Sequence, residues 1–92
     1  MGEEQAGFRV TGAVQGVGFR WWTTRTAQQL GLRGAVKNQS DGSVEVHVIG
    51  PSQAVAALER RLAEGPAGAR VKRVERTASS LPIPPSGFNI ER

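Results

Sequence analysis

The sequence predicts an α+β fold in which two helices cover one face of an antiparallel sheet. Residues 44–49 alternate with the period of a strand, and two other segments carry a one-sided apolar stripe of helical spacing. Turns rich in glycine and proline, and one Asp-Gly pair, separate these segments. In chain order the elements run β-α-β-β-α-β with a short final strand, which is the split βαβ, ferredoxin-like arrangement.

The first part of the chain is expected to hold two strands and one helix. Residues 8–12 alternate as a strand, and residues 21–31 carry an apolar helical stripe that a glycine ends. Residues 34–38 form a second, short strand. The polar residues 1–6 are expected to be a flexible terminus.

A hairpin and a second helix follow. Asp41-Gly42 is a strong hairpin signal, so the strand after this turn pairs with the strand before it. A second helix opens at Pro51 or Ser52 and ends near Ala63, just before a Gly-Pro pair. Its apolar residues again form one stripe, so only one side of this helix needs burial.

The last part of the chain is predicted to be strand, connection and strand. Residues 69–76 have strand composition, although Val71 and Val74 are three positions apart; a β-bulge between them would reconcile the spacing. The proline-rich residues 79–87 form an extended connection. Residues 88–90 form a final short strand.

Length and composition limit the possible functions. The 92 residues are expected to form a single domain over residues 1–92, and we expect a cytoplasmic monomer. No apolar run approaches the ~18 residues needed to cross a membrane. With no cysteine and one histidine, the chain has no disulfide, no thiolate nucleophile and no typical zinc ligand set, so we expect no metal or other cofactor. The net charge of +4 would attract acidic ligands.

A glycine loop that ends in an arginine is the strongest functional signal. Gly16 and Gly18 can turn successive backbone N–H groups toward one point, and the helix that starts next adds unpaired N–H groups. Arg20 can hold two phosphate oxygens at once. A cation at a helix start opposes the helix dipole, so a bound anion accounts for its position. The pattern favours a phosphate cradle.

Other phosphate-handling motifs fit less well. Trp21 occupies the third glycine position of a dinucleotide-binding motif, and no Gly-Lys-Ser/Thr follows. Thiol-based phosphatases use a similar loop with a cysteine where this chain has Val14. Water must then attack a bound phosphoryl group directly and needs a positioning group. Asn38 is the candidate, although an asparagine beside a turn can also cap the local backbone.

Two motifs resemble the signatures of the acylphosphatase family. They are Gly-Ala-Val-Gln-Gly-Val-Gly-Phe-Arg at residues 12–20, and Gly-Ala-Val-Lys-Asn at residues 34–38 with Asp-Gly-Ser-Val-Glu at residues 41–45. The similarity spans about residues 7–91. It implies a small hydrolase that cleaves the carboxyl–phosphate bond of acyl phosphates to a carboxylate and inorganic phosphate.

Carried over residue by residue, the resemblance places a site on both motifs. Arg20 would clamp the phosphate and Asn38 would orient the attacking water. Free phosphate or sulfate could occupy the same loop. The resemblance implies a phosphate cradle made of Gln15, Gly16, Val17, Gly18 and Phe19.

This sequence departs from the family pattern at two positions. Ala35 stands where the family commonly has a tryptophan, so we expect thinner packing beside Asn38. Gln39 stands where the family often has a threonine, and this difference could alter how Asn38 is held. Thr23 could supply a supporting hydroxyl or be an ordinary helix threonine.

A nucleic-acid-binding module is the main rival interpretation. RNA-recognition domains share the β-α-β-β-α-β order, but they stack bases on aromatic residues of their central strands. Here no aromatic residue lies between positions 23 and 87, so the sequence favours a solvated basic face. A relative that binds phosphate without turnover also stays open. The basic cluster comprises Arg60, Arg61, Arg70, Lys72, Arg73 and Arg76.

Three further residues carry expectations about exposure. His47 alternates with valines, so it is expected on a solvated or helix-free face of the sheet. Of the two adjacent tryptophans, Trp22 is expected to pack and Trp21 to lie nearer the surface, because neighbouring residues point in different directions on a helix.

Overall fold

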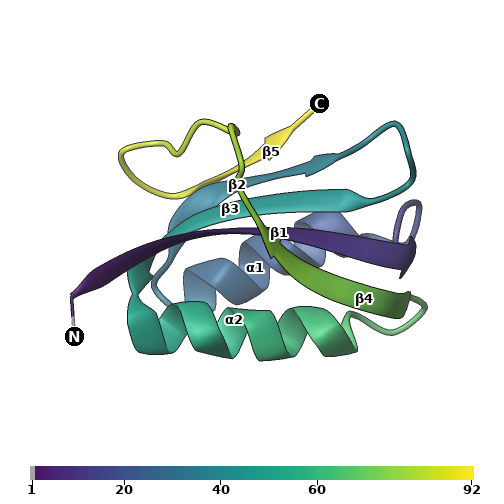
Figure 1. Ribbon diagram of the computed structural model, residues 1–92, viewed down its shortest axis with the longest axis horizontal. Helices are drawn as coiled ribbons and strands as arrows, with labels where there is room; N and C mark the ends of the chain where they lie inside the picture. Colours follow the sequence, from purple (N-terminus) through teal and green to yellow (C-terminus); the bar gives the residue numbers. More distant parts are fainter. Residues whose placement is uncertain (1) are drawn as a thin grey trace.

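Five strands form one sheet and two helices pack on one of its faces, in a computed structural model that describes residues 2–92 (Figure 1). The elements are β1 (Glu3–Ala13), α1 (Phe19–Gln29), β2 (Arg33–Asn38), β3 (Val44–Pro51), α2 (Ser52–Glu64), β4 (Arg70–Thr77) and β5 (Phe88–Glu91). The strand order is β4-β1-β3-β2-β5. The predicted order of elements and the ferredoxin-like arrangement are confirmed.

The sheet is mixed rather than antiparallel throughout. β5 runs parallel to β2, with Gly34 opposite Phe88 and Lys37 opposite Glu91. The cause is the extended connection over residues 78–87, which crosses the sheet from β4 at one edge to β5 at the other (Figure 1). Because this connection is long enough to cross the sheet, β5 can start at the same end of the sheet as β2 and run parallel to it. Strands joined by a short hairpin would be antiparallel.

The first strand begins earlier than predicted. Met1 lies outside the described residues, but Glu3 already pairs with Pro51, and the pairing continues along β3. Ala6 is buried at 7% exposure. The expectation of a flexible terminus therefore does not hold for residues 3–6, because strand pairing holds even these polar residues.

The predicted bulge is present and sits at Lys72. Thr11 lies opposite Arg73 and Gly12 lies opposite Val71, so one residue of β4 has no partner in β1. The extra residue brings Val71 and Val74 onto the same face of the sheet. Both valines pack against the core, which explains their spacing of three.

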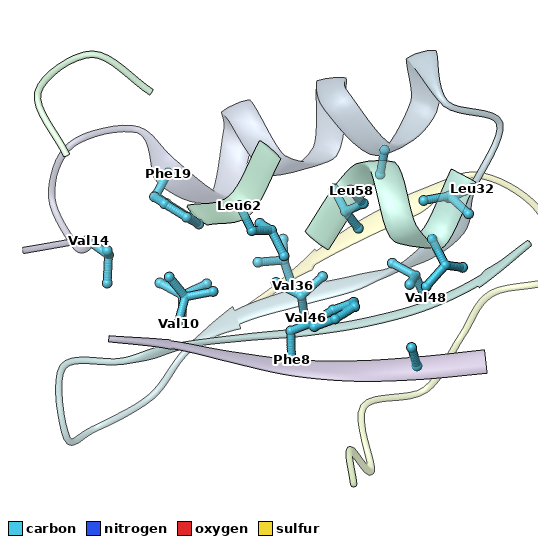
Figure 2. Close-up of a cluster of buried hydrophobic side chains, with 14 residues drawn as sticks. Phe8, Val10, Val14, Phe19, Leu32, Val36, Val46, Val48, Leu58 and Leu62 are labelled. Carbon is cyan, nitrogen blue, oxygen red and sulfur yellow. The ribbon is translucent and has the colours of Figure 1, made fainter. Parts of the chain in front are cut away.

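The core lies between the sheet and the two helices (Figure 2). Alternate residues of the strands face the helices, so Phe8 and Val46 meet Leu58 and Leu62 of α2 and Phe19 of α1. These side chains are 2% exposed or less. Their burial fixes both helices against the sheet.

The opposite face of the sheet carries His47, as predicted, but this residue is not solvated. It is 7% exposed, and its Nδ1 donates to the carbonyl of Leu81 at 2.6 Å. The connection over residues 78–87 covers it, and Arg33 donates to Pro84 O at 2.9 Å in the same connection. Ala35 lies opposite His47 and is fully buried, so this face remains packed without a large side chain there.

We expect Leu58→Ala to lower the free energy of unfolding by about 2–5 kcal/mol, because it removes a fully buried side chain and leaves a cavity. Urea unfolding measures this loss. Gln53→Ala on the exposed side of the same helix is the control and should change stability by under about 0.5 kcal/mol. Equal stability of the two variants would contradict the packing described above.

Candidate functional site

The register of β3 brings the two sequence motifs to one edge of the sheet. Val44 lies opposite Val10 on one side and Asn38 on the other. β1 and β2 therefore run parallel with β3 between them, so their carboxyl ends meet. At a strand spacing of about 4.8 Å, the backbones of Val10 and Asn38 lie about 10 Å apart. The loop that leaves β1 thus starts close to Asn38.

Asn38 is aimed toward the helices. It shares the face of Val36 and Val44, because paired and alternate residues of a sheet share a face. Its Oδ1 is buried and has no hydrogen-bond partner among residues 2–92. The side chain lines a pocket together with the start of α1. It does not serve as a backbone cap through Oδ1, so this acceptor is free for a bound molecule.

The loop between β1 and α1 is held at its ends and open in its middle. Val14 and Phe19 are 1% and 2% exposed and anchor the loop in the core. Gly16 and Gly18 each have φ of 77°, a conformation that residues with a Cβ rarely adopt. Backbone rather than side chains therefore faces the pocket at these two positions.

The first turn of α1 offers unsatisfied donors. Its first helical hydrogen bond runs from Trp22 N–H to Gly18 O at 3.0 Å, so the N–H groups of the preceding residues have no helical acceptor. No side chain caps this end and no acidic residue lies in its first turn. α1 begins at Phe19, two residues earlier than predicted, because Gly18 takes the N-cap position.

Arg20 completes the pocket from the first turn of α1. The only hydrogen bond of its guanidinium within residues 2–92 is a long one of 3.4 Å, from Nη1 to the carbonyl of Glu91. No carboxylate within the same range forms a salt bridge with it, since the salt bridges there are formed by Arg9, Arg73 and Arg76. The guanidinium is thus available to an anion.

The pocket has a volume of about 270 Å³. Its lining combines two arginines, the Asn38 amide and glycine backbone, and the part of the chain described here contributes no acidic side chain to it. Two of the predicted site residues, Gln15 and Val17, do not line this pocket as residues 2–92 form it. The lining residues are Val14, Gly16, Gly18, Phe19, Arg20, Trp21, Asn38, Ile90 and Arg92.

Gln15 has a role that sequence reasoning missed. Its Nε2 donates to the carbonyls of Gln39 at 2.7 Å and Ser43 at 2.8 Å. The side chain therefore ties the glycine loop to the β2–β3 turn, next to Asn38. The hydrogen-bond partners are backbone carbonyls 24 and 28 residues away in the sequence, and no local sequence pattern predicts such contacts.

The β2–β3 turn has its own polar network. Asp41 accepts from the Ser43 hydroxyl at 2.6 Å and from Arg9 at 2.6 Å. The Ser43 hydrogen bond, and then that from Arg9, hold the pKa of Asp41 well below its usual range. Gln39 donates through Nε2 to Glu45 at 2.5 Å. The Gln39 side chain thus contributes a hydrogen bond to Glu45, and its effect on Asn38 stays a prediction.

Thr23 is fully buried, and its Oγ1 has no hydrogen-bond partner within residues 2–92. It does not line the pocket formed by the described residues. A supporting hydroxyl and an ordinary helix threonine both stay open as interpretations of this residue.

Two of the six residues of the basic cluster are paired with carboxylates. Arg76 pairs with Glu4 at 2.7 Å and with Glu59 at 2.8 Å, and Arg73 lies 3.4 Å from Glu75. This pairing reduces the charge that a nucleic acid would contact. The interpretation of the cluster as a solvated face stays a prediction.

Comparison with known proteins agrees with the two motifs. The sequence model described as Acylphosphatase matches residues 6–90. The chain belongs to the acylphosphatase family. It is 46% identical over 82 residues to an acylphosphatase of Rhizobium etli, covering 89% of this chain and 87% of that one. It is 47% identical over 89 residues to an acylphosphatase of Aeromonas hydrophila, covering 97% and 98%.

A solved structure gives the same result for the fold. The acylphosphatase of Coxiella burnetii superposes with a TM-score of 0.87 at 35% identity, over 97% of this chain and 93% of that one. Within residues 2–92 of this acylphosphatase-family chain, no group of three or more acidic or histidine side chains is arranged to hold a metal ion. No helix in that range is long and apolar enough to cross a membrane.

We expect Gln15→Ala to lower the free energy of unfolding by about 1–3 kcal/mol, because it removes two hydrogen bonds between the glycine loop and the β2–β3 turn. Acyl phosphate hydrolysis should fall by up to about 10²-fold, because the turn next to Asn38 loses its link to the glycine loop. Urea unfolding and steady-state kinetics measure the two effects.

Gln15→Glu sharpens this test, because it keeps the shape but puts a carboxylate against two carbonyl oxygens. It should lose at least as much stability as the alanine variant. The same change at an exposed site, Gln53→Glu, is the control. A Gln15→Glu protein as stable as wild type would show that the two hydrogen bonds do not matter.

Acidification should weaken the β2–β3 turn. Because the folded-state pKa of Asp41 is lowered, its contribution to stability is present above its unfolded pKa of about 4 and is lost as pH falls through the lower folded value. The melting temperature of wild type should therefore exceed that of Asp41→Asn near neutral pH, and the gap should close below about pH 4. A gap that stays constant down to about pH 2 would argue against this linkage.

Proposed function

We propose that this acylphosphatase cleaves acyl phosphates by direct attack of water on a phosphoryl group held in the loop over residues 15–20. The chain is a hydrolase of acyl phosphates, which are small-molecule substrates. One observation carries the assignment of the site. Arg20 and Asn38 line one pocket at the start of a helix, and among residues 2–92 the Arg20 guanidinium has no carboxylate partner and the buried Asn38 Oδ1 has no donor.

The phosphoryl group carries charge that this pocket suits. Backbone N–H groups from Gln15 to Phe19 and the partial positive charge of the α1 N-terminus attract an anion. The fork of Arg20 can bind two phosphoryl oxygens. In the transition state the charge spreads over the equatorial oxygens, so donors fixed in advance stabilise it most. The same donors should bind free phosphate or sulfate.

Asn38 supplies the second half of the mechanism. Its Oδ1 accepts a hydrogen bond from water and holds the water oxygen toward phosphorus. The new bond joins that oxygen to phosphorus, and the bond from phosphorus to the carboxyl oxygen breaks. The carboxylate keeps the electron pair, and the water protons end on inorganic phosphate. A carboxylate is a good leaving group, so no strong general acid is needed.

We propose a monomer as the active unit, because both Arg20 and Asn38 come from one chain and line one pocket. A cytoplasmic location is proposed as well, since the fold uses no disulfide. Light scattering at working enzyme concentration tests the first point, and an active mass of two or more chains would contradict it.

Arg20→Gln and Asn38→Ala should each lower kcat by about 10²–10³-fold while the protein stays folded. Hydrolysis of benzoyl phosphate measures this loss. Inhibition by inorganic phosphate separates the roles, because Arg20→Gln should weaken it strongly and Asn38→Ala should largely keep it.

Arg60→Gln is the control, since Arg60 is an exposed arginine outside the pocket. It should hydrolyse benzoyl phosphate like wild type. If the folded Arg20 and Asn38 variants both keep near-normal turnover, the proposed site is wrong.

A further inference from the structure

Large exposed hydrophobic side chains gather at the mouth of the pocket. Within residues 2–92, those side chains are Trp21 at 59% exposure and Ile90 at 41%. Both line the pocket that holds Arg20 and Asn38. Exposed apolar surface is costly in water and commonly marks a binding region when it is clustered. Because this apolar surface lies beside the proposed phosphoryl site, it is placed to contact the acyl part of the substrate.

The two side chains come from separate elements that flank the pocket. Ile90 lies opposite Val36 in the parallel pairing of β5 with β2, so it shares the face of Asn38. Trp21 follows Arg20 in the first turn of α1, and α1 lies against β5. One side chain thus comes from the helix and one from the edge strand.

The ring of Trp21 is held in place although it is exposed. The guanidinium of Arg25, one turn along the helix, lies 4.8 Å from the ring centroid. This cation–π contact restrains the indole. A restrained aromatic surface loses little conformational freedom when a ligand packs on it.

We propose that Trp21 and Ile90 form the subsite for the acyl group, and that this enzyme prefers acyl phosphates with an aromatic or bulky apolar acyl group. The inference rests on the proposed function, because it takes the phosphoryl group to lie on Arg20. With the phosphate held there, the acyl group extends toward the pocket mouth and packs on Trp21 and Ile90.

An acidic acyl group is the competing possibility, because Arg92 also lines the pocket. Arg92 is exposed, and a solvated ion pair contributes little to binding. Apolar contact with an indole ring removes area from water and contributes more. The apolar acyl group is therefore the favoured substrate.

The test compares kcat/KM for benzoyl phosphate and acetyl phosphate. Losing about 50–60 Å² of apolar contact predicts that Trp21→Ala lowers the benzoyl-to-acetyl ratio about tenfold. The change should lie mainly in KM, since the contact is the same in the ground state and the transition state. Trp21→Phe should restore most of the preference, and Ile90→Ser should reduce it.

The neighbouring Trp22 provides the matched control. It packs against the core, so Trp22→Phe should keep the wild-type ratio of the two substrates even if it lowers stability. Because each ratio is taken within one protein, partial unfolding cancels from it.

Three outcomes would overturn the inference. An unchanged benzoyl-to-acetyl ratio of kcat/KM in both Trp21→Ala and Ile90→Ser would show that these side chains do not form an acyl subsite. A preference of wild type for succinyl phosphate that is lost in Arg92→Ala would assign the mouth to acidic acyl groups. Absence of hydrolysis of all three substrates by wild type would instead refute the proposed function, and the subsite with it.

Discussion

The site depends on the pairing of one strand with its two neighbours. Val44 of β3 is opposite Val10 on one side and Asn38 on the other, and this register alone brings the glycine loop and the asparagine together. A slip of one residue would turn Asn38 to the face away from the helices. The apolar residues of β3 that face α1 and α2 prevent that slip, because it would expose all of them. The amide of Gln15 then links the loop to the turn across the remaining distance.

The chemistry of the pocket depends more on position than on reactive side chains. Its donors are backbone N–H groups and the guanidinium groups of Arg20 and Arg92, and its acceptor is the neutral amide of Asn38. Such groups stabilise charge and orient water without changing their own protonation. This suits a substrate whose leaving group departs as a stable carboxylate. The polar network around Asp41 lies in the β2–β3 turn, outside the lining of this pocket.

The sequence predicts those features that local patterns encode. Alternation in β3, the Asp-Gly turn, the glycine loop and the three-residue spacing of Val71 and Val74 each report on a few neighbouring residues, and each prediction is confirmed in the fold. Long-range contacts were missed. The parallel pairing of β5, the cover of His47 by Leu81 and the bonds of Gln15 depend on where distant backbone ends up. The roles of Arg20 and Asn38 remain predictions, which the pocket supports by placing them together.

The most direct test of the central claim is a titration of the labelled protein with inorganic phosphate, followed by NMR of the backbone amides and the Asn38 side-chain amide. The account predicts saturable shifts of the amides of residues 15–20, with a smaller change at Asn38, and loss of saturation in Arg20→Gln. Shifts confined to the basic cluster, with residues 15–20 unaffected, would contradict it.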